Sequence, residues 1–383
     1  MKYVVTWNAG SSPLKVAVFE QRTWRRVAVI AIERIGLAKS ITTVRFDGTH
    51  PISTSGSIAT PAAAVRVVLG LLSTRGIDGS KVTAGLHRVV AGGRFRRPVR
   101  IDQRVIAELE KYRLRAPLHL PAALAVITAA RRNKAAVQIA CFDAAYFADL
   151  PAAATTLPID RRVARRFNLL RLGYHGLSHA AAARAAADAL ERPLHKLSII
   201  TIHLGSGCSI TAVRRGRPVE TSMGMTPAEG LMMGTRSGDI DPGVIFDLLR
   251  RGQSIDQVST MLARQSGLLG VSGYSSDLRD ILVASGYPVS GYRAPRAASR
   301  TQRQQSRLAL EMFVWRIRKY LAAYAALLGR VDAVAFTGAA GERNPQLRRL
   351  ISTGLVLPGR PKILVAPTDE ENEMLRQARN LIR

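Results

Sequence analysis

The chain has 383 residues, of which 47% are hydrophobic, and this length allows about two globular domains that each bury a core. No apolar run approaches the roughly 18 residues that a membrane-spanning helix needs, and the N-terminus has no signal-peptide pattern. Two cysteines are too few for a disulfide framework or a structural zinc site. We therefore expect a cytoplasmic protein that contacts no membrane.

The net charge of +29 would suit a nucleic acid or another polyanion as a partner. The basic residues are mostly arginines, and their clusters at 94–100, 161–166 and 293–307 lack the interleaved aromatic side chains of nucleic-acid stacking platforms. We interpret most of this charge as solvated surface and do not expect a nucleic-acid partner. Steering of anionic substrates and weak polyanion binding stay open.

The first half of the chain alternates strand-like and helix-like segments. Residues 3–18 contain two apolar runs around a small Gly/Ser turn, which predicts a strand, a tight turn and a returning strand. The other expected elements are a helix at 61–74, a strand at 83–90, helices near 102–113 and 121–132, and a strand at 137–142 that ends at Asp143.

The second half repeats the opening pattern at residues 198–213. Because small turns let backbone N–H groups approach a phosphate closely, two such hairpins predict a duplicated lobe, with the hairpins facing each other across a cleft. Strands that alternate with helices predict an α/β fold. The other expected elements are a helix at 178–191, helical residues at 241–265, an exposed loop at 284–306, a helix at about 306–328, a strand at 331–336, a Gly loop at 338–341, a helix from Pro345, a strand at 362–366 and a helix after Thr368.

Several motifs follow one another over essentially the whole chain. They are NAGSSPLKVAVFE at 8–20, HRVVAGG at 87–93, APLHLP at 116–121, FDAAYF at 142–147, GYHGLSH at 173–179, IHLGSGCS at 202–209, TSMGMTPAEGLMMGTRSGDIDPG at 221–243, GLLGVSGYSSDLRD at 267–280 and FTGAAGERNP at 336–345. Together they resemble the acetate kinase family of the ASKHA superfamily.

The resemblance implies a duplicated actin/hexokinase/Hsp70-like (ribonuclease H-like) fold with two lobes and a central cleft. The expected N-terminal lobe is 1–148, joined by the C-terminal helix at about 371–383. The expected C-terminal, nucleotide-binding lobe is 149–370. A homodimer is expected from the resemblance alone.

The activity that the resemblance implies is reversible transfer of the ATP γ-phosphoryl group to acetate, which gives acetyl phosphate and ADP. A carboxylate is already ionised at neutral pH, so the reaction needs cations and aligned N–H groups rather than a strong general base. Arginine forks such as those of Arg88 and Arg236 can grip a carboxylate or a phosphoryl group through two hydrogen bonds. By resemblance, both lie around the acetate and the phosphoryl group, His175 contacts that group, and Asp143 supports the magnesium ion.

The resemblance also implies three binding sites. The expected acetate pocket consists of Arg88, Val90, Leu118, Tyr174 and Pro227. The expected nucleotide site consists of Lys15, His203, Leu204, Gly205, Ser206, Gly207, Gly338, Ala339, Ala340, Gly341 and Arg343. The expected ligands of Mg²⁺ (or Mn²⁺) are Asn8 and Glu370.

Departures from the family pattern leave the substrates open. Tyr174 stands where Phe is usual, and its hydroxyl needs a partner, so propionate or a longer acid is an alternative acceptor. Ala339 and Arg343 alter the loop expected to hold the adenosine, so a donor such as pyrophosphate is an alternative to ATP. A more distant alternative is a non-catalytic polyanion-binding protein on the same fold.

Two metal assignments also stay open. The C-terminal acidic run looks two residues longer than the family pattern, so Glu371 and Glu373 compete with Glu370. His175 and His179 stand four residues apart, as a metal pair would, but no third ligand stands nearby and Gly176 weakens a rigid helix between them.

Overall fold

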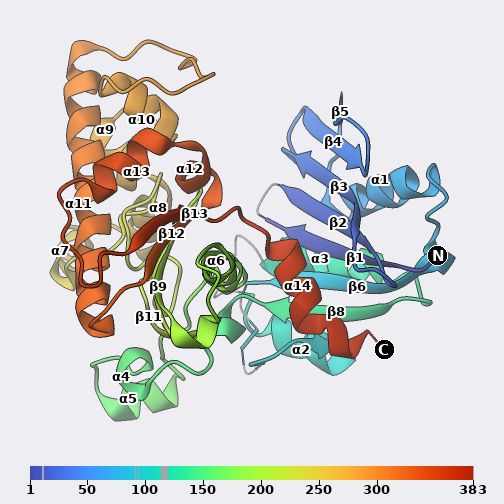
Figure 1. Ribbon diagram of the computed structural model, residues 1–383. Helices are drawn as coiled ribbons and strands as arrows, with labels where there is room; N and C mark the ends of the chain where they lie inside the picture. Colours follow the sequence, from blue (N-terminus) through green and yellow to red (C-terminus); the bar gives the residue numbers. More distant parts are fainter. Residues whose placement is uncertain (11–12, 91, 94, 114–119, 383) are drawn as a thin grey trace. The chain divides into compact units, whose positions relative to one another are not determined.

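The computed structural model describes residues 1–10, 13–90, 92–93, 95–113 and 120–382 (Figure 1). Its internal contacts divide the chain into two compact units. Unit 1 contains Met1–Ala148 and Asp369–Arg383, and unit 2 contains Asp149–Thr368. Each unit has its own β-sheet. Within the described residues, no helix is long and apolar enough to cross a membrane.

The sheet of unit 1 has the strand order β5-β4-β3-β2-β1-β6-β8-β7. An antiparallel meander of five strands, from β1 to β5, is followed by β6 and β8, which run parallel to β1, and by the short antiparallel β7. The strands are β1 (Tyr3–Ala9), β2 (Leu14–Glu20), β3 (Arg26–Glu33), β4 (Ser40–Phe46), β5 (Ile52–Gly56), β6 (Val82–Val89), β7 (Val99–Arg100) and β8 (Val137–Phe142).

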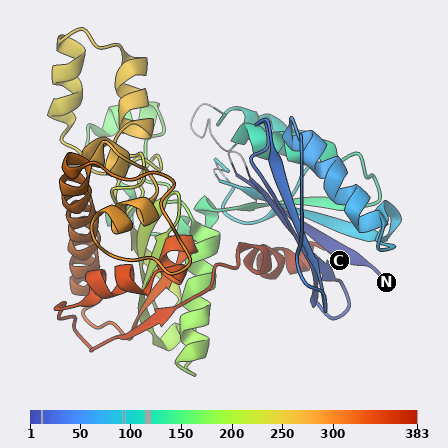
Figure 2. The ribbon, with the colours of Figure 1, turned by 90° about the horizontal axis from the view of Figure 1, so that it is seen from above.

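Helices cover both faces of this sheet, which is why β1 and β2 are buried almost continuously. Figure 2 shows α1 (Pro61–Ser73) and α3 (Leu120–Ala130) on one face and α14 (Glu370–Ala378) on the other. α1 begins where the Thr60 side chain accepts a hydrogen bond from the Ala63 N–H. α2 (Gln103–Glu110) completes the helices of this unit.

The sheet of unit 2 has the order β11-β10-β9-β12-β13. β9, β10 and β11 form an antiparallel meander, and β12 and β13 run parallel to β9. The order β3-β2-β1-β6-β8 in unit 1 has the same directions, so the predicted duplication is confirmed. The strands are β9 (Ser198–Leu204), β10 (Cys208–Arg214), β11 (Arg217–Thr221), β12 (Ala333–Thr337) and β13 (Lys362–Val365).

The two faces of this sheet carry α6 (Gly176–Ala189) and α11 (Arg300–Leu328) (Figure 2). α6 packs through alanines such as Ala183 and Ala186 against Ile199 and Ala335, so the helix lies close to β9 and β12. The remaining helices are α4 (Ala152–Thr155), α5 (Arg161–Arg166), α7 (Pro242–Arg250), α8 (Ile255–Arg264), α9 (Gly267–Ser272), α10 (Leu278–Ala284), α12 (Gly338–Arg343) and α13 (Pro345–Ser352).

The structure differs from the predicted elements in several regions. Residues 338–341 are not a loop but the start of α12. The predicted loop 284–306 ends early, because Ser299 and Gln302 form a capping box that starts α11 at Arg300. Gly176, which the sequence suggested would weaken a helix, is the first residue of α6. Strands β3, β4 and β5 had not been predicted.

Gly338 couples β12 to the end of β9. Its φ is +80°, and a Cβ atom there would lie 2.5 Å from the Leu204 carbonyl oxygen. Gly286 has a φ of +94°, but a Cβ atom there would meet nothing within 4 Å. A comparison of alanine substitutions at these two glycines therefore separates the free-energy cost of the left-handed backbone from that of a steric clash.

We predict that Gly338→Ala destabilises the protein more than Gly286→Ala. Both substitutions cost about 1 kcal/mol for the left-handed conformation. Gly338→Ala adds about 1–3 kcal/mol, because Leu204 or α12 must move. Urea unfolding followed by circular dichroism measures both. Equal losses for the two variants would contradict the packing of Gly338 against β9.

Candidate functional site

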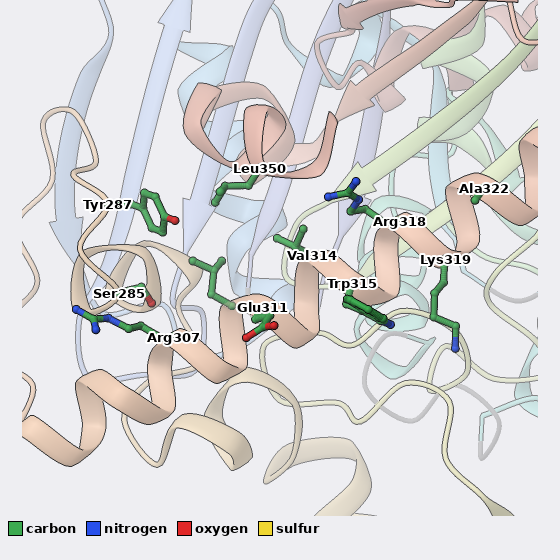
Figure 3. Close-up of a pocket in the computed structure, with 11 residues that line it drawn as sticks. Ser285, Tyr287, Arg307, Glu311, Val314, Trp315, Arg318, Lys319, Ala322 and Leu350 are labelled. Atoms are coloured by element: carbon green, nitrogen blue, oxygen red, sulfur yellow. The ribbon is translucent and has the colours of Figure 1, made fainter. Parts of the chain in front are cut away.

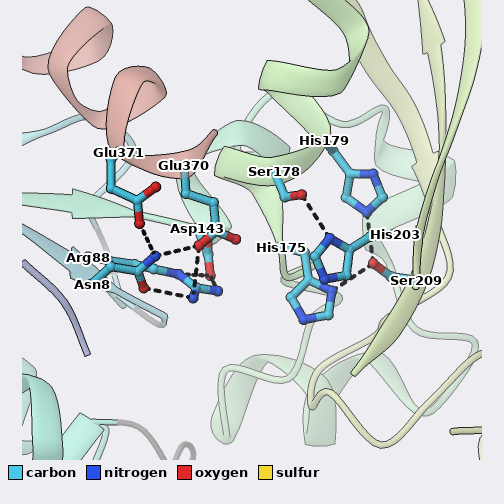
Figure 4. Close-up of polar contacts among 10 residues, drawn as sticks. All are labelled: Asn8, Arg88, Asp143, His175, Ser178, His179, His203, Ser209, Glu370 and Glu371. Atoms are coloured by element: carbon cyan, nitrogen blue, oxygen red, sulfur yellow. Dashed lines mark hydrogen bonds and ion pairs between the residues drawn. The ribbon is translucent and has the colours of Figure 1, made fainter. Parts of the chain in front are cut away.

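The polar candidates of unit 1 gather where three neighbouring strands end (Figure 4). Asn8 is in β1, Arg88 is in β6, and Asp143 follows β8 directly. These strands are parallel neighbours, so their carboxyl ends share one edge of the sheet. Arg88 donates to Asp143 Oδ2 from Nη2 (2.6 Å) and Nε (3.0 Å), and from Nη1 to Asn8 Oδ1 (3.1 Å). Three predicted residues therefore form one buried, charged cluster.

The N-terminus of α14 adds carboxylates to this cluster. Glu370 Oε2 accepts a hydrogen bond from Asn8 Nδ2 at 2.7 Å and lies 3.2 Å from Arg88 Nη1. Glu371 Oε1 accepts from the same Asn8 nitrogen at 2.9 Å. Glu373 instead accepts from Arg376 and Gln377 on its own helix. Of the three competing glutamates, the structure therefore places Glu370 and Glu371 at Asn8.

The cluster stabilises the charge of Arg88 but disfavours the charge of Glu371. Burial alone would lower the pKa of the Arg88 guanidinium, but Asp143 and Glu370 outweigh it and raise that pKa, so Arg88 is held as a cation. Burial, and then the charge of Glu370, raise the pKa of Glu371. Lys15, exposed on β2 opposite Asn8, opposes this rise. The adjacent carboxylates therefore repel each other at neutral pH.

This donor set fits a magnesium ion that shares its ligands with a substrate. Mg²⁺ usually takes one or two protein carboxylates and completes its octahedron with phosphate oxygens and water. Glu370 and Glu371 provide two carboxylates, and a divalent cation would relieve their repulsion. The described part of the chain has no group of three or more His, Cys, Asp or Glu that would hold a metal by itself.

Three histidines of unit 2 lie beside the glycine turn between β9 and β10 (Figure 4). His175, in the left-handed conformation (φ +59°), precedes α6, and its Nδ1 lies 2.8 Å from Ser209 Oγ. His179 Nε2 lies 2.7 Å from the same oxygen. His203 pairs through Nδ1 with Ser178 Oγ at 2.8 Å. His175 and His179 thus share a hydroxyl group, and the alternative of a metal pair is not supported.

The glycine turn packs directly on these side chains. A Cβ atom at Gly207 would lie 3.0 Å from His175 Cε1 and 3.5 Å from Arg236 Nη1. A Cβ atom at Gly205 would lie 3.1 Å from His203 Nε2. The rings of His175 and His203 are 4.3 Å apart between centroids. These five predicted residues therefore form a second cluster, and its close packing requires the two glycines.

Arg236 is a half-buried cation without a carboxylate partner among the described residues. Its Nη1 donates to the Pro227 carbonyl oxygen at 3.1 Å and contacts Met233 Sδ at 3.6 Å. Burial lowers its pKa, and the neighbouring Cys208 opposes that effect. An arginine remains charged even so, and its unbalanced charge makes this position suitable for an anion.

The residues predicted for the acetate pocket fall in different parts of the chain. Tyr174 is buried, and its hydroxyl donates to the Met225 carbonyl oxygen at 2.7 Å. Pro227 contacts Arg236 as described above. Val90 follows β6 in unit 1 and is also buried. Leu118 lies outside the described residues.

The segment predicted to bind adenosine surrounds α12. The Gly338 N–H donates to Thr368 Oγ1 at 3.0 Å, and Glu342 Oε1 accepts from the Thr368 backbone and hydroxyl. Gly341 is buried, Ala340 is partly buried, and Ala339 and Arg343 are exposed. The remaining predicted residues, Leu204 and Ser206, are respectively buried at the end of β9 and exposed in the turn.

Sequence reasoning missed several polar partners in unit 2. Ser178 and Ser209 lie inside the quoted motifs GYHGLSH and IHLGSGCS but were given no role. Thr201 on β9 and Glu342 on α12 were also missed. Position inside a motif was the only signal for the two serines, because only the fold brings each hydroxyl to a histidine.

A groove of about 870 Å³ lies elsewhere in unit 2, along α11 (Figure 3). Trp315, 65% exposed, and Arg318 and Lys319 line it together with Tyr287 and Leu350. None of the predicted site residues lines this groove.

The repeated meander with two parallel strands, and polar clusters at the ends of those strands, define the fold class. It is the duplicated, two-lobed α/β fold of the actin/hexokinase/Hsp70-like proteins, as the sequence predicts. The acetokinase family model matches residues 3–361, so the chain belongs to the acetokinase family. This is a family of phosphotransferases with a carboxyl group as acceptor.

Individual relatives agree with this membership. The acetate kinases of Streptomyces coelicolor and Streptomyces avermitilis are 38% and 39% identical to this chain, over 99% of it and 97% of each relative. The crystal structure of Porphyromonas gingivalis acetate kinase has a TM-score of 0.84 at 31% identity and covers 100% of both chains. A propionate kinase from Francisella tularensis has a TM-score of 0.86 at 29% identity, over 99% of this chain and 100% of its own.

We predict that Glu371→Gln stabilises the protein at neutral pH. The folded-state pKa of Glu371 lies above the ordinary value of 4.5, so the folded state favours the protonated acid. Stability is therefore lost as pH rises from the unfolded to the folded pKa, and Gln avoids this loss. The two proteins should be about equally stable at low pH and diverge as pH rises.

Urea unfolding from pH 4 to pH 8 measures this divergence. Glu110→Gln, which alters an exposed carboxylate of α2, is the matched control and should show no comparable trend. Mg²⁺ should stabilise the unsubstituted protein more than Glu371→Gln. A pH-independent difference for Glu371→Gln would contradict the repulsion between the two carboxylates.

Proposed function

We propose that this protein catalyses reversible transfer of the γ-phosphoryl group of ATP to acetate, giving acetyl phosphate and ADP. The match of the family model over residues 3–361 carries this proposal. The two clusters support it, because each contains one of the two arginines expected around the acetate and the phosphoryl group. Acetate is ionised at neutral pH, so the residues need only orient it and balance charge.

Arg88 and Arg236 have different roles in this proposal. Asp143 orients Arg88 through two hydrogen bonds to one oxygen, which presents a fixed guanidinium fork to the acetate carboxylate. Arg236, whose charge no described carboxylate balances, stabilises negative charge on the transferring phosphoryl group. His175, packed with Arg236 against Gly207, donates a hydrogen bond to the same group.

Asn8, Glu370 and Glu371 would hold Mg²⁺ or Mn²⁺ in this proposal. When bound, the ion would supply positive charge that offsets the negative charge of the nucleotide phosphates. Asn8 then orients the carboxylates through the Nδ2 atom that it already shares between them. Lys15, at the edge of this cluster, adds a further cation for the phosphates.

The nucleotide is expected at the two glycine segments of unit 2. The Gly205–Gly207 turn has no side chain larger than that of Ser206, so its backbone N–H groups can approach a phosphate beside His203. The segment Gly338–Gly341, which packs on Leu204, would hold the adenosine. Ala339 and Arg343 are exposed, so neither side chain fills space in the protein interior. We infer ATP rather than pyrophosphate as the donor from the glycines Gly338 and Gly341, which α12 keeps.

We further propose a cytoplasmic homodimer that uses its positive surface to attract anionic substrates rather than to bind nucleic acid. The family resemblance supports the dimer, and sedimentation of the purified protein tests it. The function as a non-catalytic polyanion binder is less well supported, because a mere binder has no need of the buried pair of Arg88 and Asp143.

We predict that Arg88→Ala lowers kcat/KM for acetyl phosphate formation by about 100-fold or more, because the acetate loses its oriented donor. Arg88→Lys should restore little, since an ammonium cannot form the fork. Trapping of acyl phosphate as hydroxamate measures the rates, with ATP against pyrophosphate and acetate against propionate. Arg25→Ala, which breaks an exposed pair with Asp47, is the matched control.

Each outcome of this panel is informative. ATP and acetate should give the highest rate in the unsubstituted protein. A preference of about tenfold, or 1.4 kcal/mol in the barrier, for propionate or pyrophosphate would contradict the assigned substrates. No activity with any pair would contradict the phosphotransfer function.

We predict that Tyr174→Phe leaves the ratio of the rates with acetate and propionate unchanged. The hydroxyl already donates to the Met225 carbonyl oxygen, so it does not distinguish acetate from propionate. The variant should lose about 1 kcal/mol of stability with that hydrogen bond. A tenfold change in the ratio would show that the hydroxyl selects the acid.

A further inference from the structure

The Ser209 hydroxyl lies between two imidazole rings (Figure 4). Ser209 is fully buried, and its Oγ lies 2.8 Å from His175 Nδ1 and 2.7 Å from His179 Nε2. A hydroxyl group has one hydrogen, so it can donate to only one of the rings and must accept from the other. The protonation states of His175 and His179 are therefore linked.

Hydrogen bonds link Thr201, His179, Ser209 and His175 in series, and Thr201 sets their direction. Thr201 Oγ1 lies 2.7 Å from His179 Nδ1 but 3.5 Å from the Thr211 carbonyl oxygen. Because the first contact is much the shorter, we infer that the Thr201 hydroxyl donates its hydrogen bond to His179 Nδ1. Burial, and then the nearby His203, lower the pKa of His179 well below its ordinary value, so this ring is neutral.

The positions of the other hydrogens follow, because each hydrogen bond needs one donor and one acceptor. A neutral His179 that accepts at Nδ1 carries its proton on Nε2 and donates it to Ser209. Ser209 then donates to His175 Nδ1. A neutral His175 must carry its own proton on Nε2.

We propose that Ser209 and His179 are positioning residues that hold His175 in its Nε2–H tautomer, so that a neutral ring donates a hydrogen bond to an oxygen of the transferring phosphoryl group. The proposal rests on the proposed phosphotransfer function for the identity of the ligand. The tautomer itself can be measured without that function.

The surroundings of His175 favour a neutral donor. Arg236 packs on the same Gly207 position as the His175 ring, and the His203 ring lies tilted against it with 4.3 Å between centroids, so this neighbourhood favours the uncharged ring at neutral pH. Cys208 on β10 stays an uncharged thiol, because burial raises its pKa to about 12. His179, on α6, shares the Ser209 hydroxyl with this ring.

Ser209 also stabilises an uncommon backbone conformation. His175 has a left-handed φ of +59°, which is unfavourable for a residue with a side chain. Its carbonyl oxygen accepts from the His179 N–H at 2.9 Å, and its ring is held by Ser209. Both ends of the residue are thus fixed.

The first test compares the pH dependence of kcat in the unsubstituted protein, Ser209→Ala and Ser209→Thr. In Ser209→Ala the neutral ring of His175 is free to choose either tautomer, whereas the imidazolium carries hydrogens on both nitrogens. We expect a loss of about tenfold at pH 8 that becomes smaller toward pH 6, with KM for acetate nearly unchanged. Ser209→Thr keeps the hydroxyl and should restore the original profile.

Two results would overturn the proposal in this test. One is a Ser209→Ala profile that runs parallel to that of the unsubstituted protein, which is the behaviour of a purely structural residue. The other is a Ser209→Thr variant that folds normally but keeps the Ser209→Ala profile. Circular dichroism verifies folding of each variant.

The second test is independent of activity. Long-range ¹H–¹⁵N spectra resolve the tautomers of the seven histidines, and His175→Asn identifies the signals of His175. We expect Nε2–H at pH 8 in the unsubstituted protein and a mixture in Ser209→Ala. A dominant Nδ1–H tautomer would overturn the proposal. If the protein forms no acyl phosphate, the proposed function fails, and these spectra still decide whether the tautomer is held.

Discussion

The arrangement of unit 1 depends on the ion pairs that Arg88 forms with Asp143 and Glu370. A guanidinium that is largely removed from water must be paired, and Arg88 is paired by Asp143 and Glu370 from two other segments. Asn8 and Glu370, which are 362 positions apart in the chain, are joined in the same cluster. The C-terminal helix therefore belongs to the unit that the N-terminus builds, and the site exists only when both ends of the chain are in place.

The two units share one arrangement of strands but carry different functional groups on it. In each, polar residues gather where β1, β6 and β8, or β9 and β12, end side by side. In unit 1 the side chains at this edge are a guanidinium and carboxylates, and these groups suit a carboxylate substrate and a divalent cation. Unit 2 fills it with imidazoles, hydroxyls and glycines, which suits the close approach of a phosphate.

Most of the chain's positive charge does not take part in either cluster. The arginines of α5 are exposed, and exposed ion pairs contribute little to stability. Arg88 and Arg236 differ because they are largely shielded from water, Arg88 with compensating acids and Arg236 without any among the described residues. Their environment, and not their number, gives these two arginines their proposed roles.

The sequence alone determined the fold class, the family, both hairpins and most of the candidate residues, because strand periodicity and ordered motifs are local properties. Tertiary structure decided which groups meet. It selected Glu370 and Glu371 over Glu373, because the first two residues of α14 lie beside Asn8, whereas Glu373, almost one turn farther along, pairs with Arg376 and Gln377. It joined His175 and His179 through Ser209 instead of a metal, since β10 supplies a hydroxyl that no spacing in the sequence reveals. It also gave Tyr174 the Met225 carbonyl as a partner, because that contact depends on how two distant segments fold against each other.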